Sequence, residues 1–209
     1  MPPSDPYRRL AGVYDMLIEP MQAGVREIAL EVVPPQPDWQ VLDVGCGTGT
    51  GMAHYVEAGC AVVGVDVSAA MLDKAKARLG DAAELHLTDG DKLPFADGRF
   101  DLVTTSMVLH EVPEEARVAL VEEMARVANV DGRLLLIDFR FGSLRGWKGP
   151  VFRALSAVIE RLSGHYSQFR TFKRSGGVPP LVGGGGLLIE REKIVAGGNV
   201  AIYSVTRNA

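Results

Sequence analysis

Three glycines at alternate positions, Gly45, Gly47 and Gly49, directly follow a short apolar run, residues 41–44. Such a run is typical of a strand that is buried on both faces. Glycine tolerates positive φ and lets a ligand approach the backbone, so the loop is suited to present amide N–H groups to a ligand. None of these glycines begins the spacing of a dinucleotide fingerprint, and no Gly-Lys-Ser/Thr ending of a phosphate loop follows. The loop therefore predicts a ligand site of another kind.

Carboxylates accompany the predicted strands near the ends where a parallel sheet binds its ligands. Asp43 lies inside the strand before the glycine loop, Asp66 ends the next strand, and Asp89 follows the third. Ionised carboxylates accept hydrogen bonds from hydroxyl and amino groups. An acid placed like Asp66 also occurs in nicotinamide-dependent enzymes. Asp66 alone therefore does not distinguish this site from a nicotinamide site, whereas Asp43 and Asp89 do.

These residues form a pattern, Asp-x-Gly-x-Gly-x-Gly, that resembles motif I of the class I S-adenosylmethionine-dependent methyltransferases. Three later segments resemble further motifs of that family in the same order. They are the second strand with its terminal acid (62–68), the adenine-side motif (87–95), and the fourth strand with the loop after it (100–112). The most similar subgroup contains the ubiquinone/menaquinone C-methyltransferases and many small-molecule methyltransferases. The resemblance covers residues 39–139 and fades at both ends.

The resemblance implies S-adenosylmethionine as the cofactor, with S-adenosylhomocysteine as the product. It also implies that Asp43 orients the loop and the cofactor's amino group. Asp66 would accept hydrogen bonds from both ribose hydroxyls, and Asp89 from the adenine amino group. The expected set of cofactor-binding residues is Tyr14, Asp43, Gly45, Cys46, Gly47, Gly49, Asp66, Val67, Met71, Asp89, Gly90, Asp91 and Ser106.

His110 is the residue that we expect to act as a general base if the acceptor must lose a proton. It follows the fourth predicted strand, where the acceptor enters in enzymes of this family. A structural role in that loop is the alternative. No cluster of His, Cys and carboxylate residues has the spacing of metal ligands, so the sequence implies no metal.

Strands and helices alternate along the chain, which predicts parallel pairing with helices on both faces of a sheet. The strands are expected at 40–44, 61–66, 84–88, 101–106 and 133–139, and the helices at 51–58, 68–79 and 113–128. Residues 187–196 and 199–206 read as a hairpin. The predicted fold class is α/β, with a Rossmann-like, seven-stranded, mostly parallel sheet and an antiparallel last strand.

Two segments stand outside this alternation. Residues 1–38 are expected to form a cap of two helices, at 7–19 and 20–33, and residues 39–209 the methyltransferase domain. Within that domain, residues 141–172 interrupt the alternation and are expected to form a lid on the acceptor side, with helices at 150–163 and 167–174. The lid carries aromatic residues that we expect to be exposed, namely Trp147, Phe152, Tyr166 and Phe169.

Composition limits the classes of partner. The chain has 209 residues and a formal net charge of −4, with no basic stripe of the kind that binds nucleic acid. The basic stretch 170–174 reads as a solvated face. Neither a signal peptide nor an apolar run of about 18 residues is found, so we expect a cytoplasmic protein without an integral membrane segment. The expected partner is a small-molecule acceptor, and the chain would be a monomer or a homodimer.

Two hypotheses of function follow. In the first, the protein transfers a methyl group from S-adenosylmethionine to a small, lipophilic or aromatic acceptor. In the second, the same fold binds the cofactor as a regulator or scaffold and transfers nothing. Both hypotheses predict an intact cofactor site, so only turnover separates them.

Overall fold

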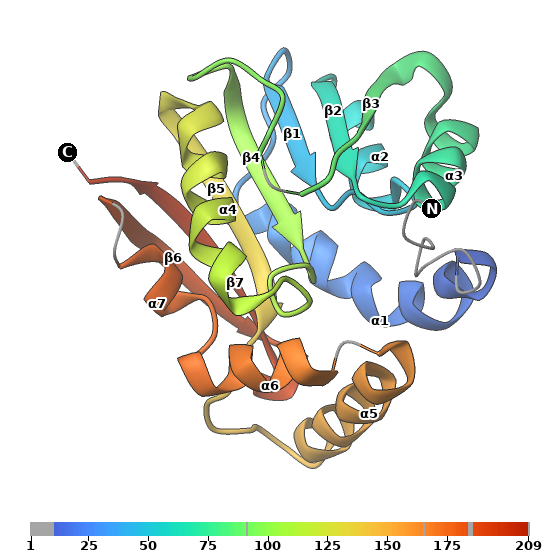
Figure 1. Cartoon of the computed structure of the whole chain (residues 1–209), viewed down its shortest axis with the longest axis vertical. Helices are drawn as coiled ribbons and strands as arrows, with labels where there is room; N and C mark the ends of the chain where they lie inside the picture. Colours follow the sequence, from blue (N-terminus) through green and yellow to red (C-terminus); the bar gives the residue numbers. More distant parts are fainter. Residues whose placement is uncertain (1–10, 91, 165, 184–185, 209) are drawn as a thin grey trace.

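A computed structural model describes residues 11–90, 92–164, 166–183 and 186–208, with the side chains of 11–21, 148, 158, 159, 162 and 163 left out. These ranges contain one seven-stranded sheet in the order β3-β2-β1-β4-β5-β7-β6 (Figure 1). Its strands are β1 Gln40–Val44, β2 Ala61–Asp66, β3 Ala83–Leu87, β4 Phe100–Ser106, β5 Ala128–Phe139, β6 Leu187–Val195 and β7 Val200–Arg207.

The pairing of the strands confirms the predicted fold class. Strands β1 to β5 pair in parallel, and β1 lies between β2 and β4, with Asp43 opposite Gly64 of β2 and Thr104 of β4. Strand β7 is antiparallel to both of its neighbours, β5 and β6. The predicted hairpin is therefore present, and a short 3-10 turn, η2 Ala196–Gly198, connects its strands.

The helices between the parallel strands begin and end within two residues of their predicted bounds. They are α2 Thr50–Glu57, α3 Ala69–Leu79 and α4 Glu114–Val127, and the 3-10 turn η1 Gly80–Ala82 precedes β3. Ser68 is the N-cap of α3, since its Oγ accepts a hydrogen bond of 3.2 Å from the N–H of Met71. Helix α4 crosses one face of the sheet, and α2 lies on the other (Figure 1).

The prediction of two N-terminal helices is wrong. A single helix, α1 Ala11–Val32, continues through Pro20 and runs beneath the carboxyl edge of the sheet (Figure 1). Proline in a helix interior removes a backbone hydrogen bond and costs roughly 3 kcal/mol. The last turns of α1 offset this cost because Ala29 and Val32 are buried in the core. Tyr14 belongs to this helix, and its side chain lies outside the described part.

Between β5 and β6 the chain forms α5 Lys148–Ser163, α6 Tyr166–Ser175 and a short α7 Pro179–Val182. Helices α5 and α6 confirm the two predicted there, whereas α7 was not foreseen. Trp147 is exposed as expected, but Phe169 is buried against Phe139 and Phe141, which corrects the expectation for that residue. Of the glycine run 183–186, residues 184 and 185 lie outside the described part.

The core fills both faces of the central strands. Leu42, Leu102, Leu135 and Ile202 are fully buried and come from four neighbouring strands. Within the described residues, no helix is both long and apolar enough to cross a membrane.

Candidate cofactor site

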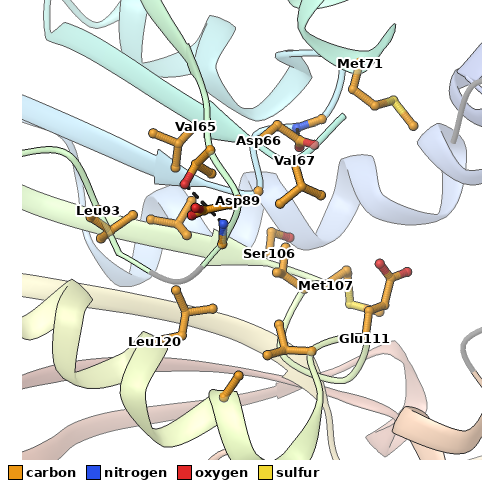
Figure 2. Close-up of a pocket in the computed structure, with 18 of the residues that line it drawn as sticks. Val65, Asp66, Val67, Met71, Asp89, Leu93, Ser106, Met107, Glu111 and Leu120 are labelled. Carbon is orange, nitrogen blue, oxygen red and sulfur yellow. Dashed lines mark hydrogen bonds between the residues drawn. The ribbon is translucent and has the colours of Figure 1, made fainter. Parts of the chain in front are cut away.

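A cavity of about 400 Å³ opens at the carboxyl edge of the sheet, within the usual size range of small-molecule sites (Figure 2). Strands β1, β2 and β4 meet it with their carboxyl ends, the residues directly after β3 border it as well, and α4 forms its far wall. The lining residues are Val44, Gly45, Gly47, Val65, Asp66, Val67, Met71, Thr88, Asp89, Gly90, Leu93, Ser106, Met107, Val108, Glu111, Val112, Pro113, Ala116 and Leu120.

Most of the expected cofactor-binding residues reach this cavity. Those that line it are Gly45, Gly47, Asp66, Val67, Met71, Asp89, Gly90 and Ser106. Asp43, Cys46 and Gly49 are not among the lining residues. Asp91 lies outside the described residues, as does the side chain of Tyr14. The carboxyl ends of four strands therefore meet at one site, as the order of the motifs predicts.

The glycine loop has the backbone shape that glycine alone adopts at low cost. Gly45 has φ +74° and donates its N–H to the carbonyl of Val65 at 2.9 Å. A Cβ at this position would overlap the side chain of Val108. Gly47 has φ +54°, and open space surrounds the position of its missing Cβ. Close approach by a ligand is thus possible at Gly47, where no side chain stands in the way.

Asp66 ties the glycine loop to the start of α3. Its Oδ2 accepts the N–H of Gly47 at 2.8 Å, and its Oδ1 accepts the N–H of Ser68 at 2.9 Å. Burial raises the pKa of Asp66, and these hydrogen bonds to the ionised form oppose the rise. An ionised carboxylate has about four acceptor positions, so Asp66 retains capacity for hydroxyl groups in the cavity.

Cys46 and Gly49 shape the loop from behind. A Cβ on Gly64 would lie 2.8 Å from the Sγ of Cys46, so the thiol packs across β2 in the core. Burial raises the pKa of this thiol well above its ordinary value. Gly49 has φ +77° and is the N-cap of α2, where a Cβ would lie 3.1 Å from that of Ala75. Both residues hold the loop against its neighbours rather than facing the cavity.

Asp43 is also buried behind the loop. Burial and the charge of Asp66 raise its pKa to about 7, and the guanidinium of Arg26 on α1 partly opposes this rise. The carboxyl group of Asp43 therefore holds its proton to a higher pH than an ordinary aspartic acid.

The sequence analysis did not predict most of the residues that line the cavity opposite Asp66 and Asp89. Met107 lines the cavity with φ +59° and donates its N–H to the carbonyl of Ile137 at 2.8 Å. Such a backbone is costly for a residue other than glycine and often marks a functional site. Pro113, Ala116 and Leu120 follow helical spacing at the start of α4, and this periodicity was the available signal.

The comparisons with known proteins agree with this geometry. Residues 41–132 match the family described as a methyltransferase domain. A demethylmenaquinone methyltransferase of Renibacterium salmoninarum is 34% identical over 168 residues, which are 77% of this chain and 70% of that protein. The chain belongs to the class I S-adenosylmethionine-dependent methyltransferases. Its cofactor is accordingly S-adenosylmethionine.

The methyltransferase is also similar to a further relative and to a solved structure. A nocamycin O-methyltransferase of Saccharothrix syringae is 34% identical over 169 residues, which are 75% of this chain and 58% of that protein. The solved DhpI–SAH complex has a TM-score of 0.66 at 20% identity, and the match covers 96% of this chain and 93% of that one. At that identity the likeness supports the fold alone.

The described residues fit the cofactor of a methyltransferase. The open cradle at Gly47 and the two lining carboxylates, Asp66 and Asp89, supply backbone space and acceptors for hydroxyl and amino groups. Val67, Met71 and Leu93 add apolar surface (Figure 2). A nucleoside with an attached amino acid presents the complementary groups.

His110 of the methyltransferase does not line the cavity, and its side chain is only 2% exposed. Its Nδ1 lies 2.7 Å from Oδ1 of Asp138, and its Nε2 lies 3.4 Å from Oε1 of Glu160. Burial by itself lowers the pKa of His110, but these carboxylates more than reverse that effect and raise the pKa to about 10. The imidazole is therefore protonated near neutral pH and has no free lone pair with which to accept a proton. This geometry argues against the expected role of His110 as a general base.

His110 and two glutamates form a cluster of three potential metal ligands. The spacing of these residues along the sequence did not reveal the cluster. Single atoms of His110, Glu111 and Glu160 lie within 4.8 Å of one another. Glu160 belongs to α5 and lies 50 residues after His110 in the sequence. Within this cluster, Nε2 of His110 lies 3.4 Å from Oε1 of Glu160 and 3.9 Å from Oε1 of Glu111.

Proposed function

We propose that the methyltransferase acts on a small acceptor that is lipophilic or aromatic. The observation that carries this proposal is the apolar half of the cavity. Away from the carboxylates, its lining includes Val108, Val112, Ala116 and Leu120. Such a surface favours flat or apolar molecules over sugars and free amino acids. The names of two relatives, a demethylmenaquinone methyltransferase and a nocamycin O-methyltransferase, agree with this class of acceptor.

For the cofactor, we assign acceptor roles to the lining carboxylates. Asp66 is placed at the end of β2 to accept the ribose hydroxyls, and Asp89 after β3 to accept the adenine amino group. S-adenosylmethionine supplies a methyl group already activated on a cationic sulfur. The task of the protein is then to position the acceptor and to exclude water, which in well-oriented reactions contributes up to about 7–11 kcal/mol.

The acceptor side carries one further ionisable group. Among the described lining residues, the acidic side chains are those of Asp66, Asp89 and Glu111. With the first two assigned to the cofactor, Glu111 is the residue that we propose to face the acceptor. It stands beside His110, and the imidazolium holds it in place, since the two side chains lie 3.9 Å apart.

The test measures release of S-adenosylhomocysteine with quinols, phenols, amines and sugars as acceptors. Turnover with quinols or phenols, and none with sugars, is the expected result. Calorimetry with S-adenosylhomocysteine and NAD checks the cofactor site separately. Tight binding of S-adenosylhomocysteine without turnover on any acceptor would instead favour the hypothesis that the protein is a regulator or scaffold that transfers no methyl group.

We also propose that residues 141–172 cover the acceptor side. Helix α6 is anchored, because the buried Arg117 of α4 donates to Gln168 O at 2.6 Å and to Thr171 Oγ1 at 2.9 Å. At its C-terminal end, α5 reaches the site through the ion pair of Glu160 with His110. Hydrogen exchange should therefore show that α5 opens in the free protein and becomes protected with cofactor and acceptor, while α6 stays protected throughout. Equal, strong protection of residues 150–163 in both states would contradict the proposal that this segment covers the acceptor side.

A further inference from the structure

Charge is distributed very unevenly along this chain. Residues 140–177 contain eight of its 22 Lys and Arg but only one of its 26 Asp and Glu, Glu160. This segment thus carries a formal charge of +7, while the rest of the chain carries −11, which together give the net −4. The cations on its surface include Arg145, Arg161, Arg170, Lys173 and Arg174, all of them exposed.

The described residues on the inward face of α5 are glycine or polar, which is unusual for a helix that packs on a protein. Gly149, Arg153, Ser156 and Glu160 recur at helical spacing and form that face. Arg153 donates to the carbonyl of Arg140 at 2.9 Å and to Oδ1 of Asn199 at 3.1 Å. Gly149 fits against the turn at Gly197, where a Cβ would lie 2.7 Å from a carbonyl oxygen. Hydrogen bonds and ion pairs therefore hold this helix in place.

The outward face of the same region is apolar. Trp147, the N-cap residue, is 76% exposed, and Val151 and Leu155 on the helix are 56% and 44% exposed. These residues are spaced four apart, so they form one stripe on the side of α5 that faces away from the protein. Helices α5 and α6 lie together at the same end of the molecule (Figure 1). The cationic residues and the apolar stripe thus belong to one region of the surface.

From these observations we infer that the outer surface of α5, with the cations of α5 and α6, docks on an anionic lipid membrane. An interfacial helix combines a tryptophan, an apolar face and flanking Lys or Arg, and it lies in the plane of the membrane without crossing it. The apolar stripe enters the boundary of the acyl chains, and the cations meet the lipid phosphates. This surface is close to the cavity, because Glu160 of α5 contacts His110 and the next residue, Glu111, lines the cavity.

Nucleic acid is the other polyanion that this charge would attract. Nucleic-acid surfaces are bound mainly through phosphate contacts and stacking, which do not require an aliphatic stripe. Val151 and Leu155 would gain nothing from a phosphate backbone, but both would be removed from water by a bilayer. The apolar stripe therefore favours lipid.

The experiment uses tryptophan fluorescence of the full chain. The protein has two tryptophans, and in a Trp39→Phe variant the emission comes from Trp147 alone. Vesicles of phosphatidylglycerol and phosphatidylcholine should shift this emission to the blue, and vesicles of phosphatidylcholine alone should have a much smaller effect. Brominated acyl chains should quench the emission, since the indole reaches the acyl boundary.

Two variants separate the parts of the surface. In one, Arg170→Gln, Lys173→Gln and Arg174→Gln together should weaken partitioning by about 100-fold, at roughly fivefold for each cation near an anionic surface. In the other, Val151→Gln and Leu155→Gln should abolish quenching by brominated lipid. The matched control is Val130→Thr with Leu188→Thr, which removes two aliphatic side chains, 79% and 53% exposed, from strands at other places in the fold. This control should partition like the parent, and all variants should bind S-adenosylhomocysteine alike, which shows that they are folded.

Three outcomes would overturn the proposal. They are the absence of binding to anionic vesicles, equal binding by the Val151/Leu155 variant and the parent, and salt-sensitive binding to duplex DNA or RNA with none to vesicles. The inference does not depend on methyl transfer, so a protein without turnover can still satisfy it.

Discussion

The Nδ1 atom of His110 lies 2.7 Å from Oδ1 of Asp138, and the backbone N–H of His110 donates to Oδ2 of the same carboxylate at 3.2 Å. Both residues are buried. The contact joins the loop after β4 to the end of β5, directly beside the part of the loop that lines the cavity. Because the imidazole is charged, this junction makes the stability of the protein depend on pH.

We expect the free energy of unfolding to fall between pH 6.5 and pH 10 because of His110. Its pKa is about 10 in the folded protein against 6.5 ordinarily, so in this window the folded chain holds a proton that the unfolded chain has lost. The stabilisation is fully present below pH 6.5 and is lost at about 1.4 kcal/mol per pH unit as the pH rises. Urea titrations across the window measure this slope. A His110→Gln variant should lack it, and equal slopes for the two proteins would contradict the assignment.

Asp43 should produce a pH dependence in a lower window. Its folded pKa of about 7 exceeds the ordinary 3.8, so the folded chain binds the extra proton between these values and stability falls as the pH rises through them. Asp43→Asn should remove this fall of about 1.4 kcal/mol per pH unit, and the variant should bind S-adenosylhomocysteine more weakly. Unfolding titrations at pH 5 and pH 7 test the first effect, and calorimetry tests the second. If the difference in stability between the two proteins does not change with pH, Asp43 is not the group that titrates.

The two loop glycines provide a matched pair. Ala at either position must adopt positive φ, which costs roughly 1–2 kcal/mol. At Gly45 the added methyl group also overlaps Val108, whereas at Gly47 it meets open space. Gly45→Ala should therefore destabilise the protein by more than Gly47→Ala, and adding Val108→Ala should recover the difference in part. Equal losses of unfolding free energy would show that the overlap is relieved without cost.

Replacing Asp66 by Ala should weaken binding of S-adenosylhomocysteine by about 1.5–3 kcal/mol, the range for hydrogen bonds to charged groups. The free protein should also lose some stability, because the N–H groups of Gly47 and Ser68 lose their acceptor. Asp66→Asn keeps one acceptor oxygen and should show a smaller loss of stability. Calorimetry and thermal unfolding separate the two effects, and unchanged affinity in both variants would remove Asp66 from the cofactor site.

The sequence by itself predicted the α/β fold class, the edge of the sheet that holds the cavity and most of the expected residues that line it. These follow from local rules: glycine alone suits the loop at 45–49, and Asp66 and Asp89 come directly after parallel strands whose carboxyl ends must meet at one edge. The hairpin at 197–198 and the N-cap at Ser68 are equally local. Each of these features depends on residues that are close together in the chain.

The tertiary structure decided which of these residues face the ligand and which lie behind them. Asp43 and Cys46 share the motif with Gly45, but the packing of α1, α2 and β2 encloses them. His110 is charged because carboxylates 28 and 50 residues away in the chain fold against it. On α5, periodicity predicts an apolar stripe but cannot tell which side faces the protein. The polar contacts of Arg153 and Glu160, made with distant parts of the chain, turn that stripe toward the solvent.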